Sequence, residues 1–231
     1  MINIIQTKEV DIFSQLRLEE FLLKAKTDSF CIISEGRKDA IVLGISNKSN
    51  ELVHINNAKK DNIQVIRRFS GGGSVFVDKD TVFVTFIFSS DLLKIDLYPE
   101  TIMKWSEGFY KKVFDSEDFK LIENDFVFKD KKIAGNAQYI KKNRFLLHTS
   151  FLFDFDIKKI NKYLQVPKKA PAYRNKRNHE DFITKISPYI SKNEFFENLY
   201  KTLKSSFNCQ QIKEIEAPQL DINYSTQIIS I

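Results

Sequence analysis

The stretch Arg67–Asp78 reads RRFSGGGSVFVD and carries three of the seven glycines in this 231-residue chain. Runs rich in β-branched residues lie on both sides of the glycines, Ile63–Arg67 before and Ser74–Val77 after, which predicts a strand, a loop and a second strand. Because glycine lacks Cβ, the loop can adopt positive φ and bring its backbone close to a ligand. Consecutive amides beside two arginines favour a phosphate or carboxylate. A tight turn with two surface arginines remains the alternative on this stretch alone.

The glycine loop does not match two common nucleotide-binding motifs. The sequence contains no G-x-x-x-x-G-K-[ST], and the glycine spacing differs from G-x-G-x-x-G. Both of those motifs precede a helix, whereas a strand is predicted to follow this loop. If the loop binds a nucleotide, it must do so through a different type of binding motif.

The rest of the chain predicts an α+β fold, with strands near the centre and helices before, between and after them. Thr81–Phe88 is apolar on both faces, which is typical of a central covered strand. The spacing of apolar residues predicts helices over 11–26, from Pro99 through Val113, and over 193–207. The other expected elements are a strand pair (Phe30–Ser34 with Ala40–Gly44), a hairpin (Phe126–Phe128 and Lys132–Ala134 around Lys129–Lys131), a strand (Phe145–Phe155) and a mobile basic loop (Pro167–Arg177).

Composition bounds the class of protein. The chain is 42% hydrophobic with a formal charge of +6, as expected of one folded domain that can meet acidic partners. No run approaches the roughly 20 apolar residues of a membrane span, and the N-terminus lacks a leader pattern. Cys31 and Cys209 are too few and too far apart for a metal motif or disulfide framework, and Cys31 is expected to be a buried small hydrophobe. We expect a cytoplasmic protein with a single core.

Three further clusters carry polar groups near the predicted strands. They are Lys132–Gln138 (KIAGNAQ), Asn124-Asp125 and His148-Thr149-Ser150. A lysine followed by small residues can reach a phosphate without crowding it, but most lysines are surface residues. The histidine can be a hydrogen-bonded structural residue, and Asn124-Asp125 can form a metal–phosphate site or an Asx-turn. None of the three decides the function alone.

Together, in this order and spacing, these segments resemble the lipoate–protein ligase A family, the lipoate/octanoate branch of the biotin–lipoate ligases. Arg67–Asp78 resembles R-R-x-S-G-G-G-A-V-[FY]-H-D, and Asn124-Asp125 with Lys132–Gln138 resembles N-D … K-[IV]-[SA]-G-[NS]-A-[QY]. His148–Phe153 resembles H-H-G-T-L-L more loosely. The likeness covers about residues 1–190.

The resemblance implies a central mixed or antiparallel sheet flanked by helices, similar to class II aminoacyl-tRNA synthetases. It implies one catalytic domain over 1–231, with its core at about 1–190 and a helical extension over 191–231. The activity would be activation of lipoate or octanoate with ATP and Mg²⁺ to acyl-AMP, and transfer to a lysine. The acceptors would be lipoyl domains of 2-oxoacid dehydrogenase complexes or glycine cleavage H protein. Only about 40 residues follow Ile190, so a separate accessory subunit is one expectation; nucleic acid and membrane partners are not expected.

By position, the resemblance makes Lys132 the catalytic lysine, and no residue is assigned to a metal. The residues that it implies for binding nucleotide and acyl-adenylate are Arg68, Gly71, Gly72, Gly73, Ser74, Val75, Phe76, Asn124, Asp125, Lys132 and His148. A protonated lysine and loop amides would stabilise the charge that develops on the α-phosphate. We further expect Phe69, Val77 and Phe151 to line an apolar acyl pocket.

Departures from the family pattern leave alternatives open. Val77 stands where the family has a histidine, and Thr149 replaces a glycine. One alternative is an ATP-independent octanoyl or lipoyl transferase that uses Cys209, although no activating motif surrounds that residue. Another is a degenerate, non-catalytic module that binds lipoate or a nucleotide. The basic loop Lys168–Arg177 is expected to help dock an acidic lipoyl domain, with Arg174 and Arg177 as the testable contacts.

Overall fold

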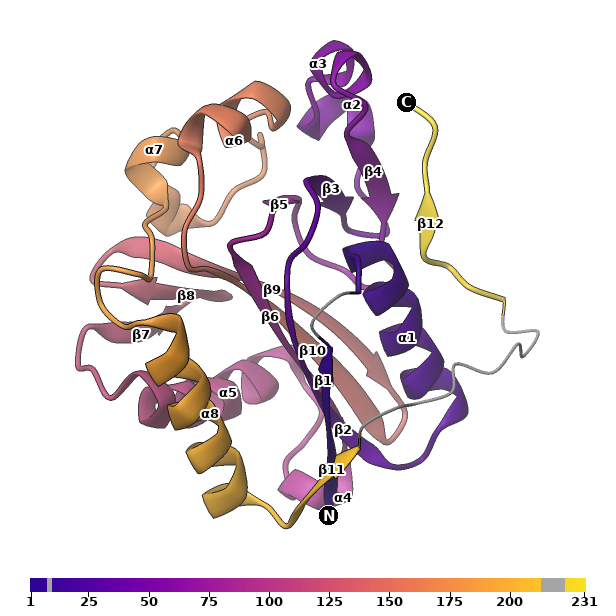
Figure 1. Cartoon of the computed structure of the whole chain (residues 1–231), viewed down its shortest axis with the longest axis vertical. Helices are drawn as coiled ribbons and strands as arrows, with labels where there is room; N and C mark the ends of the chain where they lie inside the picture. The colour runs from indigo at the N-terminus through magenta and orange to yellow at the C-terminus, as the bar shows by residue number, and fades with distance from the viewer. Residues whose placement is uncertain (8–9, 213–222) are drawn as a thin grey trace.

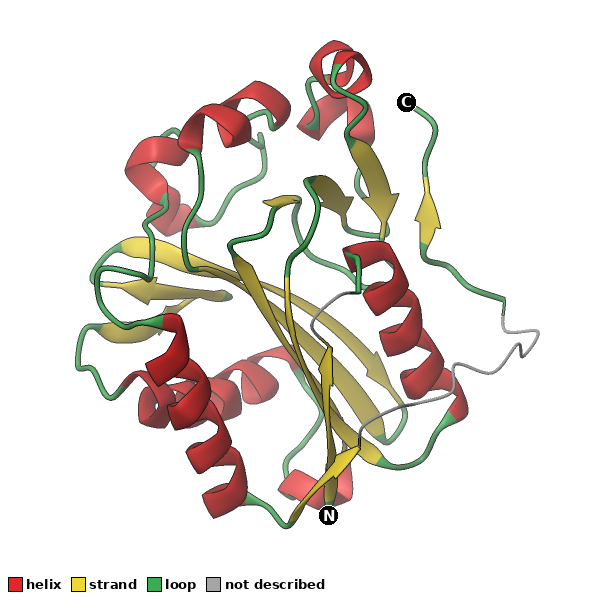
Figure 2. Ribbon diagram, in the orientation of Figure 1, coloured by secondary structure: helices red, strands yellow, loops and turns green. Residues whose placement is uncertain are grey.

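The computed structural model describes residues 1–7, 10–212 and 223–231, which form two β-sheets and surrounding helices (Figures 1 and 2). The larger sheet has the strand order β11-β1-β2-β6-β10-β9-β8-β7. Its strands are β1 (Ile2–Thr7), β2 (Ser29–Glu35), β6 (Thr81–Ser89), β7 (Phe119–Ile122), β8 (Asp125–Phe128), β9 (Lys131–Lys141), β10 (Arg144–Leu152) and β11 (Cys209–Ile212). β1 pairs in parallel with β2 and β11, and the remaining neighbours are antiparallel, so the sheet is mixed.

The smaller sheet holds the glycine loop. Its strand order is β12-β4-β3-β5, formed by β3 (Ala40–Leu43), β4 (Gln64–Arg67), β5 (Val75–Val77) and β12 (Gln227–Ile228). β3 pairs in parallel with β4 and antiparallel with β5. The glycines therefore connect two strands that lie on either side of β3.

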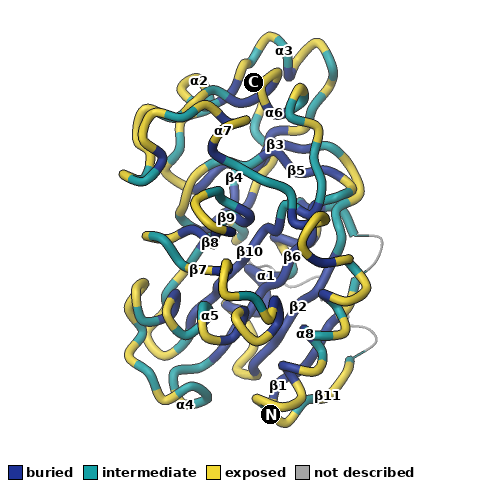
Figure 3. Tube along the Cα trace, turned by 90° about the vertical axis from the view of Figure 1, so that its left-hand side faces the viewer, coloured by how far each residue is buried: buried dark blue, intermediate teal, exposed yellow. Residues whose placement is uncertain are grey.

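Two long helices cover one face of the larger sheet, α5 (Pro99–Phe114) and α8 (Lys192–Ser206). α5 begins at a proline, whose missing N–H costs nothing in a first turn, and the Ser191 side chain caps α8. Aromatic residues dominate this core, where Tyr110, Phe151 and Phe195 are among the buried side chains. The central strands β2, β6 and β10 are buried along most of their length (Figure 3).

The opposite face of the larger sheet meets α1 (Ile12–Ala25) and the smaller sheet. Asp11 caps α1 by accepting the amide of Ser14 at 3.1 Å. The outer face of the smaller sheet packs against α6 (Ile157–Tyr163) and the short α2 (Ser49–Leu52) and α3 (Ile55–Lys60). The other short elements are α4 (Ser90–Leu93), η1 (Ala172–Arg174) and α7 (His179–Phe182). The smaller sheet is thus held between two apolar layers.

The sequence-based elements are largely confirmed, with one wrong pairing. The helices over 11–26 and 193–207, the central strand β6 and the hairpin of β8 and β9 are present. Phe30–Ser34 and Ala40–Gly44 do not pair with each other, because β2 lies in the larger sheet and β3 in the smaller one. The extension after residue 190 contains α8, and its described remainder includes the strands β11 and β12 rather than helix.

Among the described residues, no helix combines the length and apolar character needed to cross a bilayer. Cys31 lies fully buried in β2, as expected of a small hydrophobe.

Candidate functional site

The glycine loop lies against β9 of the larger sheet. The Gly71 amide donates to the carbonyl of Gln138 at 3.3 Å, and the Asn47 side chain donates to the carbonyl of Gly72 at 3.0 Å. Gly72 and Gly73 are exposed, so their amides can reach a ligand. The buried hydroxyl of Ser70 and the side-chain oxygen of Gln138 have no partner among the described atoms. The loop and this part of β9 therefore offer unused polar groups close together.

Gly72 is required by geometry. Its φ is +102°, and a Cβ there would lie 2.8 Å from Nη2 of Arg68 and 3.0 Å from the carbonyl oxygen of Asn136. Both contacts are shorter than real Cβ atoms normally allow. Gly73 has no heavy atom within 4 Å of the same position. The close approach of the loop to β9 thus rests on Gly72.

Arg68 shapes the loop from inside the protein. Its side chain is 4% exposed, and Nη2 donates to the carbonyls of Gly71 at 2.8 Å and Gly73 at 2.9 Å. Burial lowers the pKa of the guanidinium to about 10, against an opposing effect of Glu19, so Arg68 remains charged at neutral pH. The predicted contact of Arg68 with nucleotide stays a prediction, since these donors bind loop carbonyls here.

Lys132 is paired with Asp125. The Lys132 ammonium lies 2.7 Å from Oδ1 of Asp125, whose Oδ2 accepts the hydroxyl of Tyr173 at 2.8 Å. Burial and the neighbouring Asp125 carboxylate raise the pKa of Tyr173, which therefore stays a hydrogen-bond donor. Tyr173 was not among the predicted site residues, and its place in an irregular segment gave no local signal. The three side chains form one line of hydrogen bonds.

A β-bulge at the start of β9 places the Lys132 side chain beside Gly135, on the side of the strand that faces Val75 of β5. The register with β8 shifts between Phe126 and Val127, and Ile133 and Ala134 both belong to the α5–α8 core. The side chain of Lys132 then lies on the same side as Gly135, with Nζ 4.0 Å from the position that a Gly135 Cβ would take. A larger residue at 135 would crowd the ammonium.

The remaining predicted residues are only partly gathered at this place. Val75 lies over Gly135, with Cγ1 3.4 Å from the Cβ position there, and Ser74 is half-buried beside it. Phe76 points the other way and stacks on Tyr163 of α6 at 5.4 Å. Asn124 is exposed, and its backbone carbonyl accepts the side chain of Asn136 at 3.0 Å.

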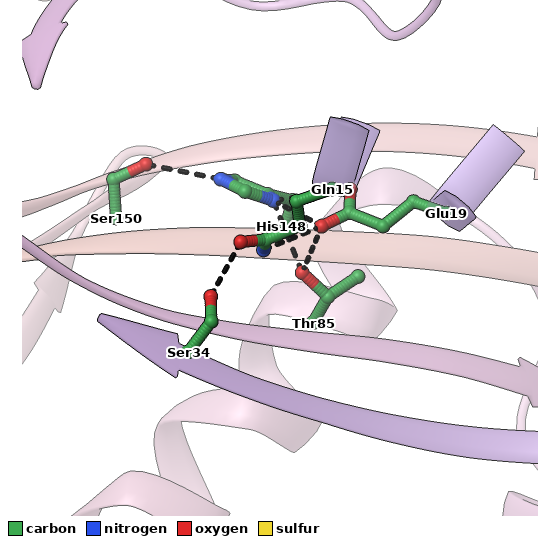
Figure 4. Close-up of polar contacts among 6 residues, drawn as sticks. All are labelled: Gln15, Glu19, Ser34, Thr85, His148 and Ser150. Carbon is green, nitrogen blue, oxygen red and sulfur yellow. Dashed lines mark hydrogen bonds and ion pairs between the residues drawn. The ribbon is translucent and has the colours of Figure 1, made fainter. Parts of the chain in front are cut away.

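His148 belongs to a buried polar network between the larger sheet and α1 (Figure 4). Its Nδ1 lies 3.0 Å from Oε1 of Glu19 and 3.0 Å from the hydroxyl of Thr85, and its Nε2 lies 3.2 Å from Oγ of Ser150. Gln15 donates to Glu19 at 2.9 Å and accepts the hydroxyl of Ser34. Every polar group of the histidine is satisfied by protein.

The sequence-based choice of site residues missed Glu19. It follows Leu16 on the apolar stripe of α1, and its side chain is fully buried. A carboxylate on a buried stripe needs a partner inside the protein, which was the signal available in the sequence. His148, 129 residues away, supplies that partner.

The expected acyl pocket of Phe69, Val77 and Phe151 is wrong. The three side chains belong to three different apolar clusters, because Phe151 faces α5 and α8 whereas Phe69 and Val77 lie on the opposite side of the sheet. Alternation along β10 explains this, since Phe151 and its neighbour Ser150 must face opposite ways.

The basic segment 168–177 is held more tightly than expected. Arg174 is 5% exposed and packs over Phe182 at 4.6 Å, and Arg177 forms an ion pair with Asp130 at 2.9 Å. Nε of each arginine donates to the carbonyl of the other. Nη2 of Arg174 has no hydrogen-bond partner among the described atoms. The expectation that Arg174 and Arg177 contact a lipoyl domain stays a prediction.

Cys209 lies far from the glycine loop in the sheet. It begins β11, the edge strand on the opposite side of β1 from β2, β6, β10 and β9. Burial raises the pKa of its thiol, and Sγ donates to the carbonyl of Leu203 at 3.4 Å. These surroundings disfavour a thiolate nucleophile.

The fold is shared with known lipoate-binding proteins. The crystal structure of P. falciparum LipL1 in complex with lipoate matches with a TM-score of 0.70 at 20% identity, covering 93% of this chain and 67% of that one. The putative lipoate protein ligase Ta0514 of T. acidophilum with bound lipoic acid matches with a TM-score of 0.72 at 16% identity, covering 93% and 90%. At these identities the likeness establishes the fold alone.

The sequence establishes the family. Residues 11–208 match the lipoyl protein ligase A/B catalytic domain, and the chain belongs to that family. The inactive lipoate–protein ligase 2 of Plasmodium falciparum is 29% identical, covering 91% of this chain and 71% of that protein. The probable lipoate-protein ligase A of Mycoplasma pneumoniae is 28% identical, covering 75% of this chain and 52% of that protein. The match thus spans only about half of the Mycoplasma relative.

Proposed function

We propose that this protein is a lipoate–protein ligase, which activates lipoate or octanoate with ATP and transfers the acyl group to a lysine of a lipoyl domain. The observation that carries the proposal is the ammonium of Lys132, held beside Gly135 under the strand that follows the glycine loop. Membership of the family and the exposure of Gly72 and Gly73 in the loop support the same reaction.

The chemistry would use Lys132 as a fixed positive charge. When the carboxylate of the acyl substrate attacks the α-phosphate, negative charge builds up on the phosphate oxygens. An ammonium already oriented by Asp125 and the glycine-loop amides would stabilise that charge without reorganising. Pyrophosphate then leaves, and the acceptor lysine attacks the acyl carbonyl and displaces AMP. Lys132 would not act as a nucleophile in either step.

Mg²⁺ is expected with ATP, but no residue is assigned to it. Asp125 has one oxygen on Lys132 and the other on Tyr173, and the described residues contain no group of three His, Cys, Asp or Glu side chains able to hold a metal. A magnesium ion that accompanies ATP is commonly held largely by phosphates and water.

A non-catalytic module that binds lipoate or nucleotide is the second candidate. It is favoured by the relative described as inactive and by Val77, which places an apolar side chain where the family has a histidine. Against it stands the Lys132–Asp125 pair, which retains a charged group at the position expected for catalysis.

The experiment incubates the purified protein with lipoate, ATP, Mg²⁺ and an apo lipoyl domain, in parallel with octanoyl-carrier protein in place of ATP. Formation of acyl-AMP and acylated domain, both lost in Lys132→Ala, is the expected result. Binding of lipoate or ATP without acyl-AMP would favour the non-catalytic module. Transfer that needs only the carrier protein would instead identify a transferase.

A further inference from the structure

The segment Asn223–Ile231 runs beside α1 and the smaller sheet (Figure 1). Within it, β12 pairs antiparallel with β4, with Gln227 opposite Arg67 and Ile228 opposite Ile66. The Ile229 amide extends the ladder by donating to the carbonyl of Val65 at 2.9 Å. This pairing occupies the edge of the strand that leads directly into the glycine loop.

A buried carboxylate anchors the same segment. The side chain of Glu20 is fully buried and accepts the amides of Ser225 at 2.7 Å and Thr226 at 2.9 Å. Lys24 bridges the anchor, since its ammonium donates to Glu20 at 2.6 Å and to the carbonyl of Asn223 at 3.1 Å. Because two successive amides bind one carboxylate, both the position of the segment along α1 and its direction are fixed.

An aromatic contact adds to the anchor. The guanidinium of Arg17 lies 3.9 Å from the ring centroid of Tyr224, close enough for a cation–π interaction. Three side chains from successive turns of α1 (Arg17, Glu20 and Lys24) therefore contact the four consecutive residues 223–226. The helix provides a rigid support because its opposite stripe is buried in the core.

Thr226 connects this anchor to the glycine loop. Its hydroxyl accepts the amide of Phe69 at 3.3 Å, and the residue is only 3% exposed. Arg68 lies between Arg67 and Phe69 in the chain, and Arg67 pairs with Gln227. The segment thus holds the backbone on both sides of Arg68, whose guanidinium in turn holds the carbonyls of Gly71 and Gly73.

We propose that Thr226 is a positioning residue for the glycine loop, acting through Phe69 and Arg68 from the anchor on Glu20. The inference rests on the proposed function only in taking the loop to be the nucleotide-binding surface. Loss of the Thr226 hydroxyl should loosen the loop and weaken nucleotide binding. The turnover of bound substrates should change little, because Thr226 touches neither Lys132 nor its partners.

The test compares Thr226→Val with Thr226→Ser in the full chain. Valine keeps the shape but removes the acceptor, whereas serine retains a hydroxyl. Without any ligand, amide hydrogen exchange in a peptide spanning Phe69–Gly73 should become about tenfold faster in the valine variant and stay near wild type in the serine variant. Exchange in α5 should be unchanged in both variants, which excludes general destabilisation.

The functional arm measures the affinity for ATP. Thr226→Val should weaken it about tenfold while kcat at saturating ATP changes less than about twofold, and Thr226→Ser should restore the affinity. Unchanged exchange over Phe69–Gly73 in the valine variant would overturn the inference, as would a loss of kcat with unchanged affinity. A wild-type protein that binds neither ATP nor lipoate would refute the proposed function instead, because the exchange comparison uses no ligand.

Discussion

Lys132 and Asp125 form a direct ion pair of 2.7 Å although they belong to different strands of one hairpin. Their side chains are 23% and 11% exposed, so each is partly shielded from water. Tyr173 fixes the second oxygen of the carboxylate. The ammonium is consequently oriented before any substrate arrives.

We predict that Lys132→Ala lowers the rate of acyl-AMP formation by about 10²–10³-fold, because a preorganised charge is lost. The measurement is single-turnover formation of labelled acyl-AMP. Lys131→Ala is the matched control, since Lys131 precedes Lys132 on the same strand and is comparably exposed. Equal rates in the two variants would remove Lys132 from the mechanism.

Gly72→Ala should weaken ATP binding by at least about tenfold and lower stability by about 1–2 kcal/mol, because its φ of +102° and the carbonyl of Asn136 both exclude a Cβ. Gly73→Ala, which meets no protein atom within 4 Å, should be as stable as wild type. Isothermal titration and urea unfolding would measure both effects. The prediction fails if the two variants behave alike.

His148→Leu should destabilise the protein by about 3 kcal/mol, because it leaves the fully buried carboxyl of Glu19 without its imidazole partner. Ser150→Ala removes only the partner of Nε2 and should cost about 1 kcal/mol. Urea unfolding of both variants gives the comparison. A smaller loss for His148→Leu than for Ser150→Ala would show that the network is not a structural unit.

The pH dependence of stability should report on Glu20. Burial opposes ionisation of this group, but hydrogen bonds from Lys24, the Ser225 amide and Thr226 outweigh it and lower its pKa below 4.5. Its contribution is therefore present above the unfolded-state pKa and is lost as pH falls through the folded-state value. Unfolding free energies of wild type and Glu20→Gln should differ at neutral pH and converge as pH falls through the lowered folded-state pKa of Glu20. A constant difference would contradict the anchor.

Cys209→Ser should retain full acylation of a lipoyl domain, because this thiol lies on the outer edge of the larger sheet and burial raises its pKa. Mass spectrometry of the acceptor domain measures the yield. Loss of transfer from octanoyl-carrier protein in this variant would revive the transferase alternative.

Local signals in the sequence predicted the parts of the fold that local physics determines. The apolar residues on both faces of Thr81–Phe88 identified the central strand, and the glycines after Arg68 identified the loop before it. The pairing of Phe30–Ser34 with Ala40–Gly44 was predicted wrongly, because short apolar runs do not encode which sheet they join. β1, β7, β11 and β12 were not predicted.

The sequence identified the segments of the candidate site, but it did not predict which of their side chains contact one another. The segments containing Lys132 and the glycine loop lie together, whereas His148 turns to Glu19, a contact that spans 129 residues. Arg174 illustrates the same limit, because a basic residue in a proline-containing segment is usually exposed and this one is buried on Phe182. Such contacts depend on the packing of distant elements.

The parallel pairing of β1 with β11 places Ile2 opposite Cys209. During synthesis, β1 can join β2 early, but its other edge stays without a partner until almost the entire described chain has left the ribosome. An open strand edge in a nascent chain invites pairing with other molecules. Cells that make this protein at high rates should therefore need chaperone protection of its first strand for most of the translation time.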